Sequence, residues 1–230
     1  CDCISDKTYN RFSGKTVKLG ADISVSREAN VFYGNFDGQG HTLNCTITTE
    51  DNNVDGIAPF YYIETKPSDI NVVSPPAIRN LNVVVDITTG RRHASGLVGR
   101  SKSIPIEGCT VSGTIRTSNF GAGGFIGELN KTANIINCVS SITIIDSRSG
   151  GVASNGGFVG EVSEGDNLYF EGCLFNGKLL TTANGRTCGG FVGDNNKGTV
   201  TVTNCVYAPA ALAEGETWEG TLRSATLVRN

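Results

Sequence analysis

The chain has 230 residues, of which 30 are glycine and 6 are proline, and 38% are hydrophobic. Lys and Arg number 19 against 22 Asp and Glu, so the net charge of −3 lacks the basic excess that is typical of nucleic-acid binding. No apolar run approaches the roughly 20 residues of a membrane span. Only two histidines are present, which excludes a three-histidine metal site. This composition predicts a soluble, glycine-rich β protein with no nucleic-acid partner and no membrane span.

The first 40 residues are predicted to form an N-terminal cap and a first coil. Residues 16–19 and 23–25 have the β-branched, alternating character of short strands. The segment Asp37-Gly38-Gln39-Gly40 is typical of a tight turn. Since a stack of strands must cover its terminal edges, capping is the expected role of this end.

An internal repeat follows the N-terminal segment. The pattern Gly-x-x-Gly recurs at 96–99, 124–127, 157–160 and 190–193, with starts 28, 33 and 33 residues apart. A cysteine lies 13 to 16 residues after the first glycine of each copy: Cys109, Cys138, Cys173 and Cys205. We interpret 59–62 as a degenerate earlier copy, and Cys45 as the cysteine position of the copy before it. Units of about 30 residues predict a solenoid, because each must stack on its neighbours to bury its apolar face.

The residue before each cysteine position is always asparagine or glycine: Asn44, Asn80, Gly108, Asn137, Gly172 and Asn204. These two residue types tolerate positive φ best, so each copy is predicted to turn sharply there in a left-handed conformation. On both sides of the turn, apolar residues recur at every second position, as at Ile87, Ile115, Ile144 and Leu179. This period predicts short strands and argues against helix.

The repeat predicts one all-β domain, a right-handed parallel β-helix (solenoid) of about six coils. Residues 1–40 provide the cap and first coil, 41–207 the β-helix repeats, and 208–230 the C-terminal cap. Equivalent residues are expected to stack about 4.8 Å apart. This stacking predicts an interior aromatic column of Phe125, Phe158 and Phe191.

The repeat cysteines are predicted to form a second interior column of buried, reduced thiols, made of Cys109, Cys138, Cys173 and Cys205. Disulfides between adjacent coils are within reach, but parallel Cβ vectors would strain them. Asn137 and Asn204 are expected at the stacked turns, where their amides can hydrogen-bond between coils. Cys1 could be an exposed thiol or a lipid-attachment cysteine. The chain does not begin with methionine, and we expect it to be part of a larger parent chain.

These motifs together resemble a known family. The Gly-Phe-Val-Gly copies, the Asn-Cys and Gly-Cys turns, the block Phe36-Asp37-Gly38-Gln39-Gly40-His41-Thr42-Leu43 and the segment 17–23 are similar to the GLUG-motif repeats of bacterial surface proteins. The resemblance covers roughly residues 15–207. It implies a β-helical module in a secreted or wall-attached protein, such as adhesin-like proteins and regions beside immunoglobulin A peptidase domains. The family brings no catalytic motif to carry over.

The residue after each Gly-x-x-Gly supplies the best chemical candidates: Arg100, Glu128, Glu161 and Asp194. Stacking would align an arginine and three carboxylates on one ligand face. Three readings stay open: solvated turn residues, contacts to a cation or glycan, and catalysis by Glu128, Glu161 and Asp194. Retaining glycosidases need two carboxyls about 5 to 5.5 Å apart. Any acidic ladder gives this spacing, so catalysis is the weakest of the three.

Other candidates carry weaker signals. His41 is expected to make local hydrogen bonds in its turn, and His93 to be solvated in a loop. The acidic segment 50–55 could bind calcium through oxygen ligands, although a solvated loop fits it better. The aromatic segment 60–62 could stack on a sugar, although core packing fits it better. No other cofactor or metal site is expected, and no hydrolase, nucleotide-binding or metalloprotease motif occurs.

The main hypothesis is an extracellular β-helical surface module of a bacterium. It would be adhesive or structural and present a stacked face to a host or environmental glycan or protein. The first alternative is a polysaccharide lyase or glycoside hydrolase, which rests on analogy of fold and on the acidic column. The second alternative is an inert spacer within a larger surface protein.

Overall fold

The computed structural model describes residues 11–51, 54–65, 74–148, 154–181 and 188–217. These segments fold into parallel strands and turns, with no helix among them. The larger sheet has 11 strands: β1 (Thr16–Lys18), β3 (Ala29–Phe32), β4 (Asn35–Asp37), β6 (Phe60–Ile63), β7 (Ile78–Arg79), β9 (Val98–Glu107), β11 (Ile126–Ile136), β14 (Val159–Val162), β15 (Asn167–Glu171), β19 (Val192–Asn195) and β20 (Thr199–Thr203). The second sheet has eight: β2 (Ile23–Val25), β5 (Thr42–Thr49), β8 (Asn82–Thr89), β10 (Thr110–Thr117), β12 (Val139–Asp146), β16 (Leu174–Phe175), β17 (Lys178–Thr181) and β21 (Val206–Tyr207). A short third sheet pairs β13 (Asn155–Gly156) with β18 (Cys188–Gly189).

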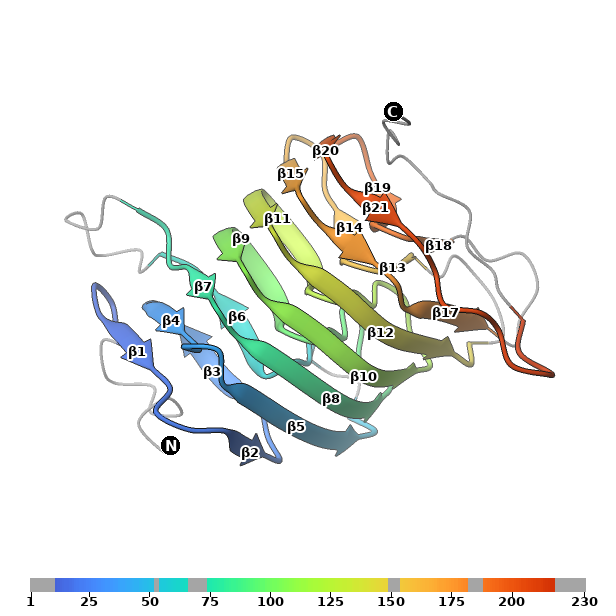
Figure 1. The fold of residues 1–230 in the computed structure, drawn as a ribbon, viewed down its shortest axis with the longest axis horizontal. Coiled ribbons are helices and arrows are strands. Elements are labelled where there is room, and N and C mark those ends of the chain that lie inside the picture. Colours follow the sequence, from blue (N-terminus) through green and yellow to red (C-terminus); the bar gives the residue numbers. More distant parts are fainter. Residues whose placement is uncertain (1–10, 52–53, 66–73, 149–153, 182–187, 218–230) are drawn as a thin grey trace.

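The strands stack as the coils of a right-handed parallel β-helix, which confirms the predicted fold class (Figure 1). Strands from successive coils lie side by side, as in the order β5-β8-β10-β12-β16-β21 of the second sheet. The chain makes about five turns, slightly fewer than the six that the repeat count predicts. The first passage, from β2 to β5, is shorter than the later ones and pairs only three residues.

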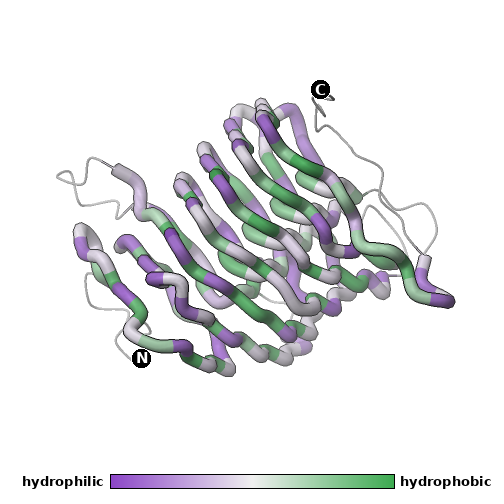
Figure 2. Tube along the Cα trace, viewed as in Figure 1, coloured by the Kyte–Doolittle hydropathy of each residue, from purple (hydrophilic) through white to green (hydrophobic). Residues whose placement is uncertain are grey.

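The interior is built from the alternating apolar positions of each strand. The predicted series Ile87, Ile115, Ile144 and Leu179 is confirmed, because each residue pairs with the next in register and each is at most 1% exposed. Hydrophobic and hydrophilic segments alternate along the coils in Figure 2. Burying one face of every strand against the opposite sheet supplies the main stabilising free energy of such a fold.

The three repeat phenylalanines stack face to face in the interior. The ring centroids of Phe125 and Phe158 are 5.0 Å apart, and those of Phe158 and Phe191 are 5.2 Å apart, with interplanar angles of 18° and 5°. Phe170 packs edge-on against the last two rings. Because all four rings are at most 1% exposed, this column is a continuous aromatic core of the C-terminal coils.

The repeat cysteines form a column of free thiols. The amide nitrogen of Cys109 lies 3.4 Å from Cys138 Sγ, and that of Cys173 lies 3.3 Å from Cys205 Sγ. Cys205 is half-buried, since it belongs to the last described coil. Burial raises the pKa of the Cys205 thiol. Cys1 lies outside the described residues.

The left-handed turns fall at five of the six expected positions. Asn80, Gly108, Asn137, Gly172 and Asn204 have φ between 50° and 62°. The alternation of Asn and Gly has a packing reason, because a Cβ atom on Gly172 would overlap the amide oxygen of Asn137. Each glycine therefore leaves room for the asparagine amide of the coil before it.

The expected turn at Asn44 is wrong, and so is the alignment of Cys45 with the cysteine column. Cys45 lies inside β5 and pairs with Val85, four residues beyond Leu81, which occupies the cysteine place in its coil. The turn of that coil is made instead by Gln39 and Gly40, both with positive φ. A second alignment is wrong by one residue, since Phe60 pairs with Val98 rather than with Leu97.

Four strands of the second sheet end in the same side-chain to backbone hydrogen bond, which the sequence analysis did not predict. The side-chain oxygens of Thr49, Thr89, Thr117 and Asp146 each accept a hydrogen bond from the amide two residues later, at 2.8 to 3.2 Å. Such local bonds turn the chain out of a strand while giving the backbone amide a hydrogen-bond partner. The column marks where the chain leaves the second sheet in four successive coils.

Candidate functional site

The Gly-x-x-Gly strands bring the predicted ligand-face residues into one column. Arg100 on β9 pairs in register with Glu128 on β11, which pairs with Glu161 on β14, which pairs with Asp194 on β19. Tyr62 on β6 continues the column on the other side of Arg100. We call Arg100, Glu128, Glu161 and Asp194 the charged column.

The second glycine of each motif allows a loop to cross the outer face of the strand. A Cβ atom on Gly127 would overlap the carbonyl oxygen of His93, and one on Gly160 would overlap that of Gly121. These close approaches of backbone to backbone require glycine. The crossing segments half-bury the charged column, so Glu128 and Glu161 side chains are only 13% and 23% exposed.

His93 lies inside this covered column, so the expectation that it is solvated is wrong. The residue is 3% exposed and has a positive φ of 55°. Its Nε2 is 3.2 Å from Glu161 Oε2, and its Nδ1 is 3.7 Å from Glu128 Oε2. Gly121 makes the room, because a Cβ atom there would overlap the imidazole ring. The imidazole therefore lies between two stacked carboxylates.

Arginines complete the charge balance around this histidine. Arg100 Nε forms an ion pair with Glu128, and Arg92 forms one with Asp55. The hydrogen bond from His93 lowers the pKa of Glu161 against the opposing effect of burial. In the same way, the hydrogen bond from Arg92 lowers the pKa of Asp55. Phe120 closes the group, with its ring 5.6 Å from the imidazole and edge-on to it.

Asp194 is the last described residue of the charged column, and its side chain has weaker contacts than those of Glu128 and Glu161. Its Oδ2 lies 3.5 Å from the hydroxyl of Ser154, at the limit of a hydrogen bond. The side chain is partly exposed. Of the three carboxylates it is the one with the weakest protein partner in the part of the chain that the structure describes.

The arrangement fits an internal ion-pair ladder better than a pair of catalytic carboxyls. In a retaining glycosidase the two carboxyls flank the scissile bond of the substrate. Here the imidazole of His93 occupies the space between Glu128 and Glu161. Like charges on adjacent coils would repel one another, and the ion pair of Arg100 with Glu128 offsets that repulsion. The signal in the sequence was His93, three residues before the first Gly-x-x-Gly at 96–99, but its position depends on the path of the loop, which the sequence pattern does not give.

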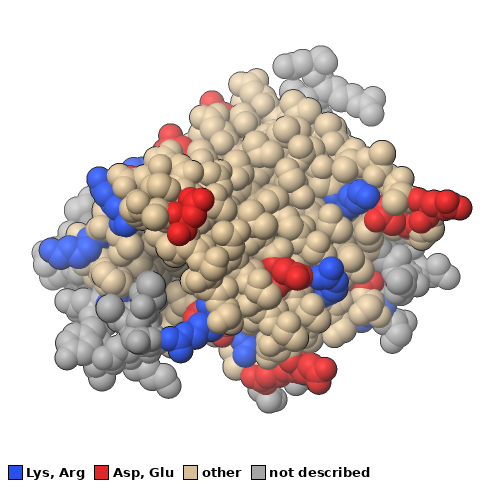
Figure 3. Space-filling view, turned by 60° about the horizontal axis from the view of Figure 1, so that its bottom comes forward, with Lys and Arg blue, Asp and Glu red and all other residues tan. Residues whose placement is uncertain are grey.

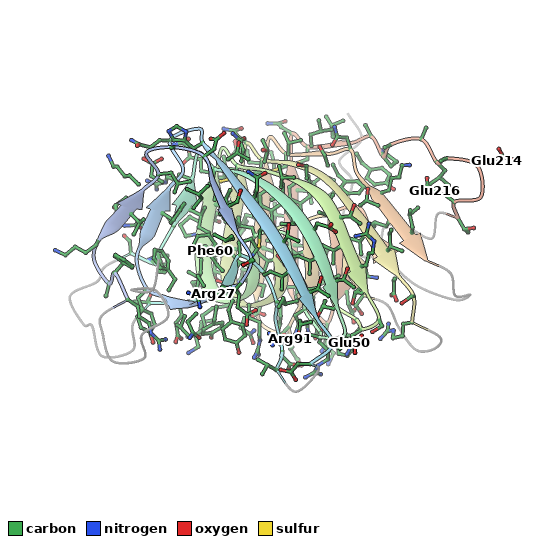
Figure 4. The ribbon with its side chains drawn as sticks, turned by 90° about the horizontal axis from the view of Figure 1, so that it is seen from below. Arg27, Glu50, Phe60, Arg91, Glu214 and Glu216 are labelled. Atoms are coloured by element: carbon green, nitrogen blue, oxygen red, sulfur yellow. The ribbon has the colours of Figure 1, made fainter. Side chains whose placement is uncertain are left out.

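The remaining candidates have structural partners. His41 Nδ1 lies 3.3 Å from Asp22 Oδ1, which also accepts the amide of Thr42 at 2.9 Å. In the acidic segment 50–55, Asp51 binds Arg91 at 3.2 Å, and Arg91 also binds Glu28. Figure 4 shows Arg91 and Glu50 near the same edge of the stack. Within the described residues, no group of three or more metal-ligating side chains occurs.

The aromatic segment 60–62 divides between the core and the surface. Phe60 is 3% exposed and packs edge-on against Phe36, with ring centroids 5.1 Å apart. Tyr61 and Tyr62 are partly exposed, and their ring centroids are 6.4 Å apart. Within this segment, therefore, Tyr61 and Tyr62 are the rings that could contact a ligand.

Comparisons with known proteins support the β-helical fold and give no information on chemistry. No protein-family model matches the chain, and no curated protein does. Among solved structures, the chain is similar to a putative immunoglobulin A1 protease from Bacteroides ovatus, with a TM-score of 0.57 and 18% sequence identity. The match covers 92% of this chain and 79% of that one. At this identity the likeness shows the β-helical fold alone. Searched for membrane spans, the described residues contain no helix long and apolar enough for one.

Proposed function

We propose that this chain is a non-catalytic β-helical module of a larger bacterial surface or secreted protein, and that it presents an ordered face to a glycan or protein. The observation that carries the proposal is the position of His93 between Glu128 and Glu161. These carboxylates contact the protein's own side chains, His93 and Arg100, so the charged column stabilises the stack of coils. Ligand binding then falls to the outer faces of the sheets.

Two further points support a surface role. The repeats resemble GLUG-motif repeats, which implies an exterior location. A stacked fold also repeats the same side-chain positions at every coil and so builds extended binding surfaces from short units. The likeness to a putative immunoglobulin A1 protease supports the fold and not the chemistry, because the sequence identity is 18%.

The alternative function is polysaccharide cleavage at the charged column. The partly exposed Asp194 beside Glu161 is the feature that favours it. Under this alternative, Glu161→Gln would abolish turnover, whereas a binding module would retain its ligands.

A panel of polysaccharides, host glycans and host proteins tests the proposal. Each is incubated with the protein, with and without calcium, and the products are sized by mass spectrometry while retained ligand is measured. We expect retention without shortened chains. Shortened chains that disappear in Glu161→Gln would overturn the proposal, and calcium-dependent retention would assign a cation to the module.

A further inference from the structure

The larger sheet carries a groove on its outer surface, formed by residues other than the charged column. Six residues that define it come from β9, from β11 and from the segments that end at 65 and begin at 74: Thr65, Pro75, Ser103, Pro105, Thr132 and Asn134. None of the described residues that line this groove is charged. This neutrality contrasts with the ion-pair ladder of the same sheet.

Two rows of neutral side chains extend from the groove along the axis of the stack. Register places Ser103, Thr132, Asn167 and Thr199 in one row, and Pro105, Asn134, Tyr169 and Thr201 in the other. All eight are half or fully exposed. We call these two sets the neutral rows; their members recur at the coil spacing of about 4.8 Å.

Tyr169 gives the rows an exposed aromatic ring. It is 42% exposed, although neighbouring strand positions Leu168 and Phe170 are at most 1% exposed. In register it lies between Asn134 on one coil and Thr201 on the next. An aromatic ring offers an apolar face, while hydroxyl and amide groups both donate and accept hydrogen bonds. This combination matches a sugar ring, which has an apolar face and a rim of hydroxyls.

The lack of charge on the described residues of the groove favours an uncharged polymer over a charged one. A charged polymer would find no complementary charge on the described residues that line the groove, and charge complementarity is what steers such ligands. Figure 3 shows that uncharged side chains make up most of the face in view, with red and blue side chains in small separate groups, one of them near its lower centre. In the row beside Pro105 and Asn134, Arg79 forms an ion pair with Glu107, with Arg79 Nε 3.5 Å from Glu107 Oε2.

We propose that the neutral rows bind an uncharged, extended glycan chain that runs along the stack, with Tyr169 as the ring on which a sugar packs. This inference rests on the proposed function in taking the module to be a binder. It adds the ligand class and the surface.

Affinity electrophoresis in gels that contain a soluble neutral polysaccharide tests the inference, with mannan, xylan and a mixed-linkage glucan as probes and polygalacturonate as the anionic comparison. We expect at least one neutral polymer to retard the protein. Tyr169→Ala should weaken that binding at least tenfold, while Tyr169→Phe should keep most of it. Val84→Ala is the matched control, because Val84 is 41% exposed on the second sheet.

Each other outcome overturns a stated claim. Retardation that survives Tyr169→Ala in a folded variant overturns the inference and leaves the proposed function standing. Retardation by none of the neutral polymers, or stronger retardation by polygalacturonate, also overturns the inference. Shortened polymer recovered from the gel would instead overturn the non-catalytic function.

Discussion

His93 Nε2 lies 3.2 Å from Glu161 Oε2, although 68 positions separate the two residues in the sequence. His93 precedes β9, Glu128 lies on β11 and Glu161 on β14, so one imidazole links three successive coils. This contact contributes to the pH dependence expected of the fold.

Stability should fall in acid partly through Glu161. The hydrogen bond from His93 holds the pKa of Glu161 below its ordinary range. A carboxyl with a lowered folded-state pKa contributes stability above its unfolded pKa of about 4.3, and this contribution is lost as the pH falls through the folded value. Glu161→Gln should therefore be less stable than the natural protein at pH 7, with the difference shrinking below about pH 4.

Urea unfolding at a series of pH values measures this effect. Glu164→Gln provides the control, because the Glu164 side chain is 69% exposed. A stability difference for Glu161→Gln that stays constant from pH 7 to pH 3 would contradict the assigned contact.

Phe158→Ala should destabilise the protein by about 3 to 5 kcal/mol, because it opens a cavity in the stacked aromatic core. Phe158 contacts rings on both sides, at 5.0 Å and 5.2 Å between centroids. Chemical denaturation monitored by far-UV circular dichroism gives the value. Val84→Ala on the exposed face should cost far less, and a loss below about 1 kcal/mol for Phe158→Ala would be incompatible with an interior ring.

Asn137→Val should cost about 1 to 3 kcal/mol, since a β-branched residue is strained at positive φ. The observed φ of Asn137 is 52°. Asn137→Gly at the same position should be tolerated much better. Thermal unfolding of the two variants measures the difference, and equal melting temperatures would argue against a left-handed turn.

Thr117→Val should cost about 1 to 3 kcal/mol by leaving a backbone amide without its partner. Thr117 is 2% exposed, and its Oγ1 accepts the amide of Asn119 at 3.0 Å. Thr114→Val, on the same strand but partly exposed, is the matched control. Hydrogen exchange should show faster exchange at Asn119 in Thr117→Val alone; unchanged exchange there would refute the capping role.

The repeat could be predicted from sequence because a solenoid imposes a regular pattern on the chain. Period-two burial at Ile87, Ile115, Ile144 and Leu179, and positive φ at Asn137, are local requirements that leave a direct mark on residue choice. The misplaced Cys45 shows the limit of this logic. The turn ahead of β5, at Gln39 and Gly40, is of a different type from the later turns, and no local signal in the sequence distinguished its register.

The repeat pattern of the chain was enough to predict the stacked β fold, the interior aromatic column and the alignment of Arg100, Glu128, Glu161 and Asp194. The contacts of that charged column could be read only from the folded molecule. The loop ahead of β9 crosses the face of the next coil above Gly127 and carries His93 between two carboxylates. A loop path over a neighbouring coil depends on contacts between distant residues, and such contacts leave no period in the sequence.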